Sequence, residues 1–455
     1  MKNYDAVVIG FGKGGKTLAA GLRKAGKTVA LVERSAKMYG GTCINVACIP
    51  SKTLEHSARM SEAMGGSFQT KAARYGQAIA EKRQLTATLR QKNLDKLVAA
   101  GVEIYNGTAS FQDPHTLQVS LPGGETEYLY GDTILINTGA APFLPPIPGL
   151  KESRRVYTSE TLMELDTLPK ELIIVGGGYI GLEFASYYTN FGAEVTVLQD
   201  GDAFIPREDR EVAQAVLDQM TDRKIKILRG VKVLALRDEG EKTLVTVETS
   251  SGSLGLAADA VLVATGRRPL VEGLNLEKAG VQLTQRGAIW TDSHLRTSAP
   301  HIYAMGDVVG GLQFTYISLD DSRIVKSALL GDGSRTTDNR GQVPYTVFLD
   351  PPLSRVGFSE EEALQAGYTV QIAKMPASAI PKAHVMRKPA GMLKMIIDQK
   401  TEKILGAHLF CAESQEMINL IKLAMDAGLS YKVLRDMIYN HPTMSEALND
   451  LLSAL

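Results

Sequence analysis

The stretch Gly10-Phe11-Gly12-Lys13-Gly14-Gly15 is the strongest indication of the fold class of this chain. It follows a short β-rich run, residues 4–9, and precedes a segment of helical composition that leads into another strand-like run. Glycines in this pattern permit a tight turn and bring the backbone close to a pyrophosphate at a helix N-terminus. Glu33 ends the second strand, where a carboxylate can hold a ribose hydroxyl. The pattern predicts a βαβ dinucleotide-binding module rather than an ordinary glycine turn.

The same arrangement recurs later in the chain. The apolar run 171–175 leads into Gly176-Gly177-Gly178-Tyr179-Ile180-Gly181, then a helical segment, then a strand-like run over 194–198. This second strand ends in Gln199, a neutral residue that favours neither a free 2′-hydroxyl nor a 2′-phosphate, so the choice between NADH and NADPH stays open. Two fingerprints predict an α/β chain with two Rossmann-like domains and two bound dinucleotides.

Composition and charge restrict the possible partners. The 455 residues contain 50 basic and 50 acidic side chains, so no excess of charge steers the chain toward nucleic acid or an anionic membrane. The N-terminus lacks the apolar core of a signal peptide, and no run of eighteen apolar residues occurs. We therefore expect a cytoplasmic protein with a small-molecule substrate.

Changes in composition suggest the domain limits. The proline-rich segment 140–149 is typical of a connector between domains, and we therefore expect a domain boundary near residue 150. The pattern becomes mixed after residue 266, and residues 331–342 are polar and glycine-bearing, as in a linker. From residue 343 strand-like and helical runs alternate without a phosphate loop, which predicts a final α+β domain.

The pair Cys43 and Cys48 lies within the segment 41–52, directly after the first module. In a regular helix residues five apart rise about 7.5 Å, whereas a disulfide needs Cα atoms within roughly 4.4 to 6.8 Å. A bridge would therefore require local distortion, and strained disulfides are the readily reduced ones. Two buried free thiols are the alternative. Lys52 would share a helical face with Cys48, although a lysine that is simply exposed to solvent explains the spacing equally simply and is the favoured interpretation. Cys411 is predicted to be a buried residue in an apolar strand.

His441 and Glu446 form a second candidate pair, near the C-terminus. Because Pro442 favours the first helical position, we expect His441 just outside a helix that starts there, with Glu446 reaching back to the imidazole. Such a carboxylate fixes the tautomer of a histidine used in proton transfer. A capping histidine without a catalytic role is the alternative.

Together these motifs resemble the pyridine nucleotide-disulfide oxidoreductases of the glutathione reductase and dihydrolipoamide dehydrogenase type, along the whole chain. The resemblance rests on residues 10–15 with Glu33, 41–52, 133–140, 176–183, 264–269, 304–308 and 441–446.

The resemblance implies a homodimer that uses FAD and NAD(P)H. FAD would lie on 1–150 and 271–342, the nicotinamide coenzyme on 151–270 and the dimer contacts on 343–455. Cys43 would exchange with substrate, Cys48 would face the flavin, and each site would take His441 from the partner subunit. The dinucleotide-binding residues that it implies are Gly10, Gly12, Gly15, Glu33, Thr42, Lys52, Ala109, Thr138, Gly139, Gly306 and Asp307 for FAD, and Gly176, Gly178, Tyr179, Ile180, Gly181, Glu183, Gln199 and Gly266 for the coenzyme, with Glu183 paired to Lys52. Ala47 departs from the family, which usually has glycine there, so its Cβ is expected to restrict the turn between the cysteines.

Within the family, residues 38–45, 312–325 and 351–357 most resemble the bacterial reactive-chlorine-resistance reductases. That group is associated with reduction of hypothiocyanous acid and, in some members, of copper(II). Dihydrolipoamide dehydrogenase is the nearer alternative, although Tyr179 stands where that enzyme usually has a small aliphatic residue. A mercuric ion reductase fits less well, because a C-terminal cysteine pair and an N-terminal metal-binding module are missing. No resident metal is predicted. A carrier subunit of a larger complex, and a soft-metal binder using Cys43, Cys48 and His441, remain alternatives.

Overall fold

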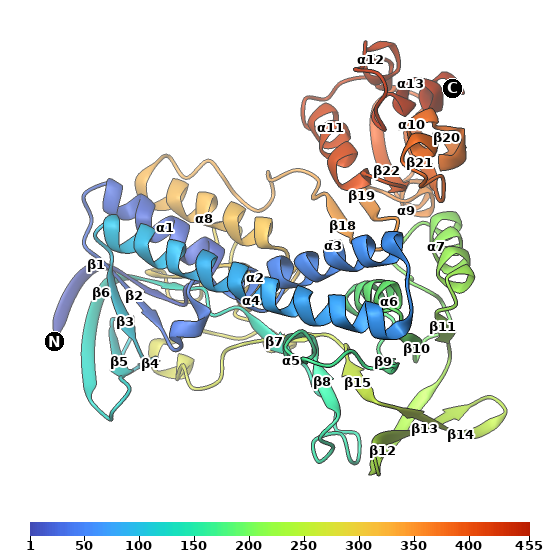
Figure 1. Cartoon of the computed structure of the whole chain (residues 1–455). Coiled ribbons are helices and arrows are strands. Elements are labelled where there is room, and N and C mark those ends of the chain that lie inside the picture. The colour runs from blue at the N-terminus through green and yellow to red at the C-terminus, as the bar shows by residue number, and fades with distance from the viewer.

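The computed structural model describes residues 1–455, and Figure 1 shows a long two-module body with a C-terminal domain at one end. The first module is a seven-stranded sheet with the order β3-β2-β1-β6-β5-β4, and a late strand, β17, pairs with β6. Its strands are β1 (Lys2–Ile9), β2 (Val29–Glu33), β3 (Glu103–Asn106), β4 (Thr108–Phe111), β5 (Thr116–Ser120), β6 (Thr126–Ile136) and β17 (Ile302–Ala304). Strands β3, β2, β1, β6 and β17 are parallel, whereas β4 and β5 form antiparallel pairs.

Five α-helices accompany this sheet. They are α1 (Lys13–Lys24), α2 (Thr42–Asn45), α3 (Cys48–Met64), α4 (Phe68–Ala99) and α8 (Thr315–Leu330), with the 3₁₀ turns η1 (Ala36–Met38), η2 (Leu276–Ala279) and η3 (Gly306–Val309). Helix α1 buries Leu18 and Leu22 with β1, β2 and α8 in one core, and each such side chain contributes about 1.5 to 3 kcal/mol. That packing fixes the turn between β1 and α1, where the first fingerprint lies.

The second module is a five-stranded, fully parallel sheet with the order β11-β10-β9-β15-β8. Its elements are β8 (Val156–Thr158), α5 (Ser159–Leu162), β9 (Glu171–Val175), α6 (Tyr179–Phe191), β10 (Glu194–Leu198), α7 (Arg210–Asp222), β11 (Lys226–Leu228) and β15 (Ala260–Val263). An antiparallel sheet of β12 (Lys232–Glu239), β13 (Lys242–Thr249) and β14 (Gly252–Ala258) extends from it, and β7 (Ala140–Pro142) pairs with β16 (Arg267–Pro269) at the connection. The two predicted Rossmann-like modules are confirmed.

The C-terminal domain is a five-stranded antiparallel sheet with helices, as expected for an α+β domain. Its elements are β18 (Tyr345–Val347), β19 (Leu353–Gly357), α9 (Glu360–Gln365), β20 (Val370–Pro376), η4 (Ala377–Ala379), α10 (Pro381–Val385), β21 (Met392–Asp398), β22 (Ile404–Phe410), α11 (Ser414–Asp426), α12 (Tyr431–Asp436) and α13 (Ala447–Ser453). Cys411 is fully buried as predicted, but it follows β22 rather than lying within it. The predicted domain limits at 150, 270 and 342 stay predictions.

Helices α3 and α4 of the first module pack against α6 of the second (Figure 1). Tyr75 of α4 meets Phe191 of α6 edge-on with ring centroids 5.2 Å apart, and its hydroxyl donates to the Leu165 carbonyl at 2.8 Å. Helix α3, which begins at Cys48, is therefore packed against both modules. No helix is both long and apolar enough to span a bilayer.

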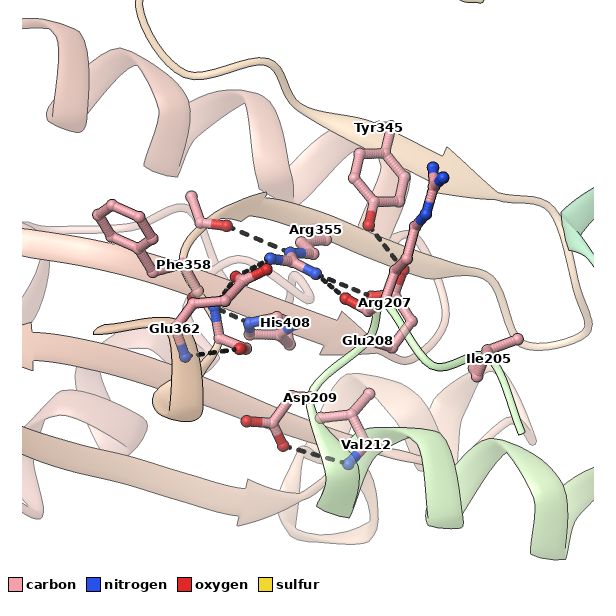
Figure 2. A network of polar contacts seen from close by, with 12 residues as sticks. Ile205, Arg207, Glu208, Asp209, Val212, Tyr345, Arg355, Phe358, Glu362 and His408 are labelled. Carbon is pink, nitrogen blue, oxygen red and sulfur yellow. Dashed lines mark hydrogen bonds and ion pairs between the residues drawn. The ribbon is translucent and has the colours of Figure 1, made fainter. Parts of the chain in front are cut away.

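A buried polar network joins the loop before α7 to the C-terminal sheet, as Figure 2 shows. The Glu208 side chain is fully buried, and its Oε1 accepts hydrogen bonds from the hydroxyls of Tyr179 and Tyr345, the latter at 2.6 Å. Arg355 of β19 contacts Glu362 and the Arg207 carbonyl, and Lys394 of β21 binds Asp209 at 3.0 Å. These contacts fix the second module to the C-terminal domain.

Candidate active site

The two cysteines lie on either side of a break between helices. Helix α2 ends at Asn45 and α3 begins at Cys48, while Val46 and Ala47 have φ values of −140° and −139°. The local distortion that a Cys43–Cys48 bridge requires is therefore present. The restriction expected from the Cβ of Ala47 stays a prediction, and the residue has a φ of −139° and a ψ of −100°. The structure presents both residues as free thiols.

The two sulfurs differ in their surroundings. Hydrogen bonding between the thiols raises the pKa of Cys43, and burial adds to that rise. The same hydrogen bonding lowers the pKa of Cys48 to about 6, with further help from the Thr315 hydroxyl, 3.3 Å from its sulfur, and the positive charge of Lys52. In the reduced pair Cys48 is thus the residue that holds the negative charge at neutral pH. Thr315 begins α8, 267 residues away, and no sequence motif indicated it.

Lys52 is held in place rather than solvated. Its Nζ lies 2.5 Å from Glu183 Oε2 and 4.7 Å from the centroid of the Phe348 ring. Glu183 Oε1 in turn accepts the backbone N–H of Phe348 at 2.8 Å. The Lys52–Glu183 pair therefore brings together α3, α6 and the start of the C-terminal domain.

The first glycine turn is shaped by a residue that sequence reasoning missed. A Cβ added to Gly10 would lie 2.4 Å from the Asn137 carbonyl, and one added to Gly12 would lie 2.3 Å from Asn137 Oδ1. The same Oδ1 accepts the N–H of Gly15 at 2.8 Å. Only glycine fits at these positions, because Asn137, directly after β6, occupies the space of a side chain.

Glu33 lies where the motif places it, at the end of β2. It is buried, its Oε2 accepts the N–H of Phe11 at 3.0 Å, and burial raises its pKa. Gly10, Glu33, Ala109 and Thr138 line one cavity.

Other residues implied for FAD lie at the start of α2 and after β17. Thr42 is the first residue of α2, and a Cβ on Gly139 would lie 3.6 Å from its hydroxyl oxygen. Gly306 has a φ of 73° and donates its N–H to Asp321 at 2.7 Å. The carboxylate of Asp307 accepts no hydrogen bond from the chain, and burial raises its pKa. A half-buried carboxylate without a donor, and a turn that leaves no room for a Cβ at Gly10, Gly12 or Gly15, fit a polar cofactor such as FAD.

The second glycine turn repeats this geometry. A Cβ on Gly176 would lie 2.4 Å from the Ala264 carbonyl, and one on Gly181 would lie 2.1 Å from the Gly176 carbonyl. Gly178 caps α6, Tyr179 and Ile180 are its first residues, and Gly266 has a φ of 114° after β15. Gln199 follows β10 and is buried.

His441 and Glu446 are brought together, as predicted, with His441 Nδ1 and Glu446 Oε2 2.8 Å apart. The helix, however, starts at Ala447 rather than at Pro442, and Glu446 is its N-cap. The contact is made across a turn, in which the Thr443 hydroxyl accepts the N–H of Glu446 at 3.3 Å. The His441 side chain is 75% exposed, and in Figure 1 α13 lies at the outer end of the C-terminal domain, away from α2. No group of three or more metal-ligating side chains is assembled, so a metal set of Cys43, Cys48 and His441 does not form within one chain.

Comparison with known families agrees with this geometry. Residues 4–322 match the pyridine nucleotide-disulphide oxidoreductase family, and residues 343–452 match the dimerisation domain of the same family. The chain belongs to the pyridine nucleotide-disulfide oxidoreductases. It is accordingly an enzyme that uses FAD and NAD(P)H, and its C-terminal domain is the family's dimerisation domain.

Individual relatives cover the full chain. The chain is 48% identical to the probable pyridine nucleotide-disulfide oxidoreductase RclA of Escherichia coli K12, over 100% of this chain and 99% of the relative. It is 35% identical to a dihydrolipoyl dehydrogenase of Mycobacterium bovis, over 100% and 98%, and 34% identical to a mercuric reductase of Staphylococcus aureus, over 98% and 81%. The solved structure of the Cu(II) complex of the HOCl-induced flavoprotein disulfide reductase RclA from Escherichia coli superposes with a TM-score of 0.94, at 47% identity and full coverage of both chains.

Proposed function

We propose that this enzyme passes electrons from NAD(P)H through FAD to the Cys43–Cys48 pair and on to a small oxidant, hypothiocyanous acid or a related reactive chlorine or sulfur species. The observation that carries the proposal is the asymmetric thiol pair at the break between α2 and α3. The 48% identity to RclA and the HOCl induction stated for its solved structure support this class of oxidant.

The chain's own residues have distinct roles in this proposal. Gly10, Gly12, Gly15, Glu33 and Asp307 hold FAD, with the further residues assigned to it above. Bound FAD accepts a hydride and gives electrons to sulfur. Cys48 holds the thiolate charge beside Thr315 and Lys52.

Cys43 is the attacking sulfur, and its raised pKa requires a base. We assign that base to His441 of the partner subunit, oriented by Glu446. Within one chain the His441 side chain is largely exposed, and α13, the helix that follows it, lies away from α2 in Figure 1, so a homodimer completes the site. Cys43 attacks the electrophilic sulfur of hypothiocyanous acid, and the S–O bond of the oxidant breaks, so that hydroxide leaves and takes up a proton to become water. The Cys48 thiolate then attacks the Cys43 sulfur, which forms the Cys43–Cys48 bridge and releases the reduced product. For hypothiocyanous acid that product is thiocyanate.

A panel of oxidants tests the substrate. Oxidation of NADH and of NADPH is followed with hypothiocyanous acid, lipoamide, oxidised glutathione, copper(II) and mercury(II). We expect hypothiocyanous acid to give the highest kcat/KM, and a higher value with lipoamide would make the enzyme a dihydrolipoamide dehydrogenase. Copper(II) is the second candidate, because the solved relative is a Cu(II) complex.

Two substitutions test the residue roles. Cys43→Ser should abolish turnover while FAD stays bound, because the attacking sulfur is lost and the glycine turns are intact. His441→Gln should slow oxidation of the thiol pair more than reduction of the flavin, as resolved by stopped flow. Full activity of Cys43→Ser would refute the assignment.

A further inference from the structure

The amide of Gln199 has a fixed orientation. Its side chain is 6% exposed, and its Nε2 donates to the carbonyls of Gly201 at 2.7 Å and Ala203 at 2.8 Å. Both amide hydrogens are thus used, and the flipped amide would place its oxygen against two carbonyl oxygens. The contacts therefore decide that Oε1 points away from the loop that follows β10.

Gln199 Oε1 is a buried acceptor without a donor in the chain. It faces the second glycine turn, because a Cβ added to Gly177 would lie 2.4 Å from it. In the first module the corresponding residue, Glu33, accepts the N–H of Phe11, the middle residue of its turn. A buried acceptor left unpaired is unfavourable, so a ligand that supplies a donor at this point recovers that free energy.

We propose that Gln199 is a specificity-determining residue that selects NADH over NADPH, because its Oε1 accepts a hydrogen bond from the 2′-hydroxyl of the adenosine ribose. The inference rests on the proposed binding of the coenzyme at the second glycine turn. The hydroxyl of NADH supplies the missing donor. The 2′-phosphate of NADPH would place negatively charged oxygens against Gln199 Oε1, which is itself an acceptor. Binding would also remove water from the phosphate charge, so both effects disfavour NADPH.

The surrounding charges favour the same choice. The loop after Gln199 carries two carboxylates, Asp200 and Asp202. A cavity of about 570 Å³ borders this loop, and its lining contains one cation, Arg229, and one carboxylate, Asp202. Arg229 Nη1 donates to the Asp202 carbonyl at 3.2 Å. The lining of this cavity therefore contains no second cation to pair with a dianion.

Binding of nucleotide fragments to the FAD-loaded enzyme tests the inference without turnover. Isothermal titration with 5′-AMP and with 2′,5′-ADP should give a Kd at least tenfold lower for 5′-AMP. Anaerobic bleaching of the flavin should likewise occur at lower concentrations of NADH than of NADPH. Equal or tighter binding of 2′,5′-ADP by the unmodified enzyme would overturn the inference.

Two variants localise the effect. Gln199→Arg should invert the ratio of the two Kd values, because it replaces the acceptor by a cation. Gln214→Arg adds the same charge at an exposed position of α7 and should leave the ratio unchanged. An unchanged ratio in Gln199→Arg with full FAD content would also overturn the inference. If neither coenzyme bleaches the flavin, the proposed function itself fails, which is a distinguishable result.

Discussion

Cys48 and Cys43 carry the same functional group in different electrostatic surroundings. Lys52 follows Cys48 by one helical turn and is held by Glu183, so its charge stays near the Cys48 sulfur. The pKa of Cys48, about 6, makes this sulfur mainly thiolate at pH 7 in the reduced enzyme. A nearby cation favours the charged form of a thiol, so the lysine helps to keep the pair asymmetric.

Replacing Lys52 tests this asymmetry at the scale of one residue. Lys52→Met should raise the pKa of Cys48 by roughly one unit, because a favourable charge is removed. The measurement is the pH dependence of iodoacetamide alkylation of the reduced enzyme, with Cys48 identified by peptide mass. Lys92→Met, at an exposed position of α4, should leave the midpoint unchanged. A midpoint that stays near pH 6 in Lys52→Met would assign the lowered pKa to Cys43 and Thr315 alone.

At the scale of elements, Lys394 holds the start of α7 against the C-terminal sheet. Its side chain is 1% exposed and contacts Asp209 at 3.0 Å, Glu211 at 2.8 Å and Glu360 at 2.6 Å. Burial of Asp209 opposes ionisation, yet the bond from Lys394 lowers its pKa below 3.8. Lys394→Met leaves that carboxylate buried without its cation, which should lower the apparent free energy of unfolding by about 3 to 5 kcal/mol.

Urea denaturation at several pH values measures the loss. A carboxyl with a lowered pKa stabilises the folded state above its ordinary pKa, and this contribution disappears as the pH falls through the folded value. The deficit of Lys394→Met should therefore be full at pH 7 and shrink below about pH 3.8. Lys374→Met is the matched control, because Lys374 contacts the same Glu211 but is 55% exposed, and it should cost less than about 1 kcal/mol. Equal losses in the two variants would contradict the role of burial.

At the scale of the whole molecule, the C-terminal domain exposes large apolar side chains, one of them three residues before His441. Ile438 is 96% exposed, and Leu423 and Val385 are 65% and 68% exposed. Exposed apolar side chains of a dimerisation domain are candidates for the surface that a second chain covers, and we propose that Ile438 belongs to it. In the proposed homodimer, a contact at Ile438 places His441, three residues further along the chain, at the interface.

Ile438→Asp should therefore weaken the dimer and separate the two half-reactions. Light scattering should show the mass of one chain, and stopped flow should show flavin reduction by NADH with little turnover of the oxidant. Leu364→Asp changes an equally apolar residue of α9 that is 53% exposed and should remain dimeric and active. A dimeric, fully active Ile438→Asp enzyme would place the interface elsewhere.

The sequence by itself determined the features whose causes are local. The two glycine turns, the strands before them, the helix break at the cysteines and the contact of His441 with Glu446 each depend on residues within a few positions, so spacing predicts them. The start of α13 was wrong by five positions, because a turn around Thr443 replaced the helical turn that Pro442 suggested.

Only the tertiary structure decided the contacts that join distant segments. Thr315 reaches Cys48 from 267 residues away, Asn137 shapes the first glycine turn, and Glu208 joins Tyr179 to Tyr345. The orientation of the Gln199 amide likewise depends on where the carbonyls of Gly201 and Ala203 lie. These contacts are set by how helices and sheets pack on one another, and packing joins residues whose separation along the chain carries no periodic signal.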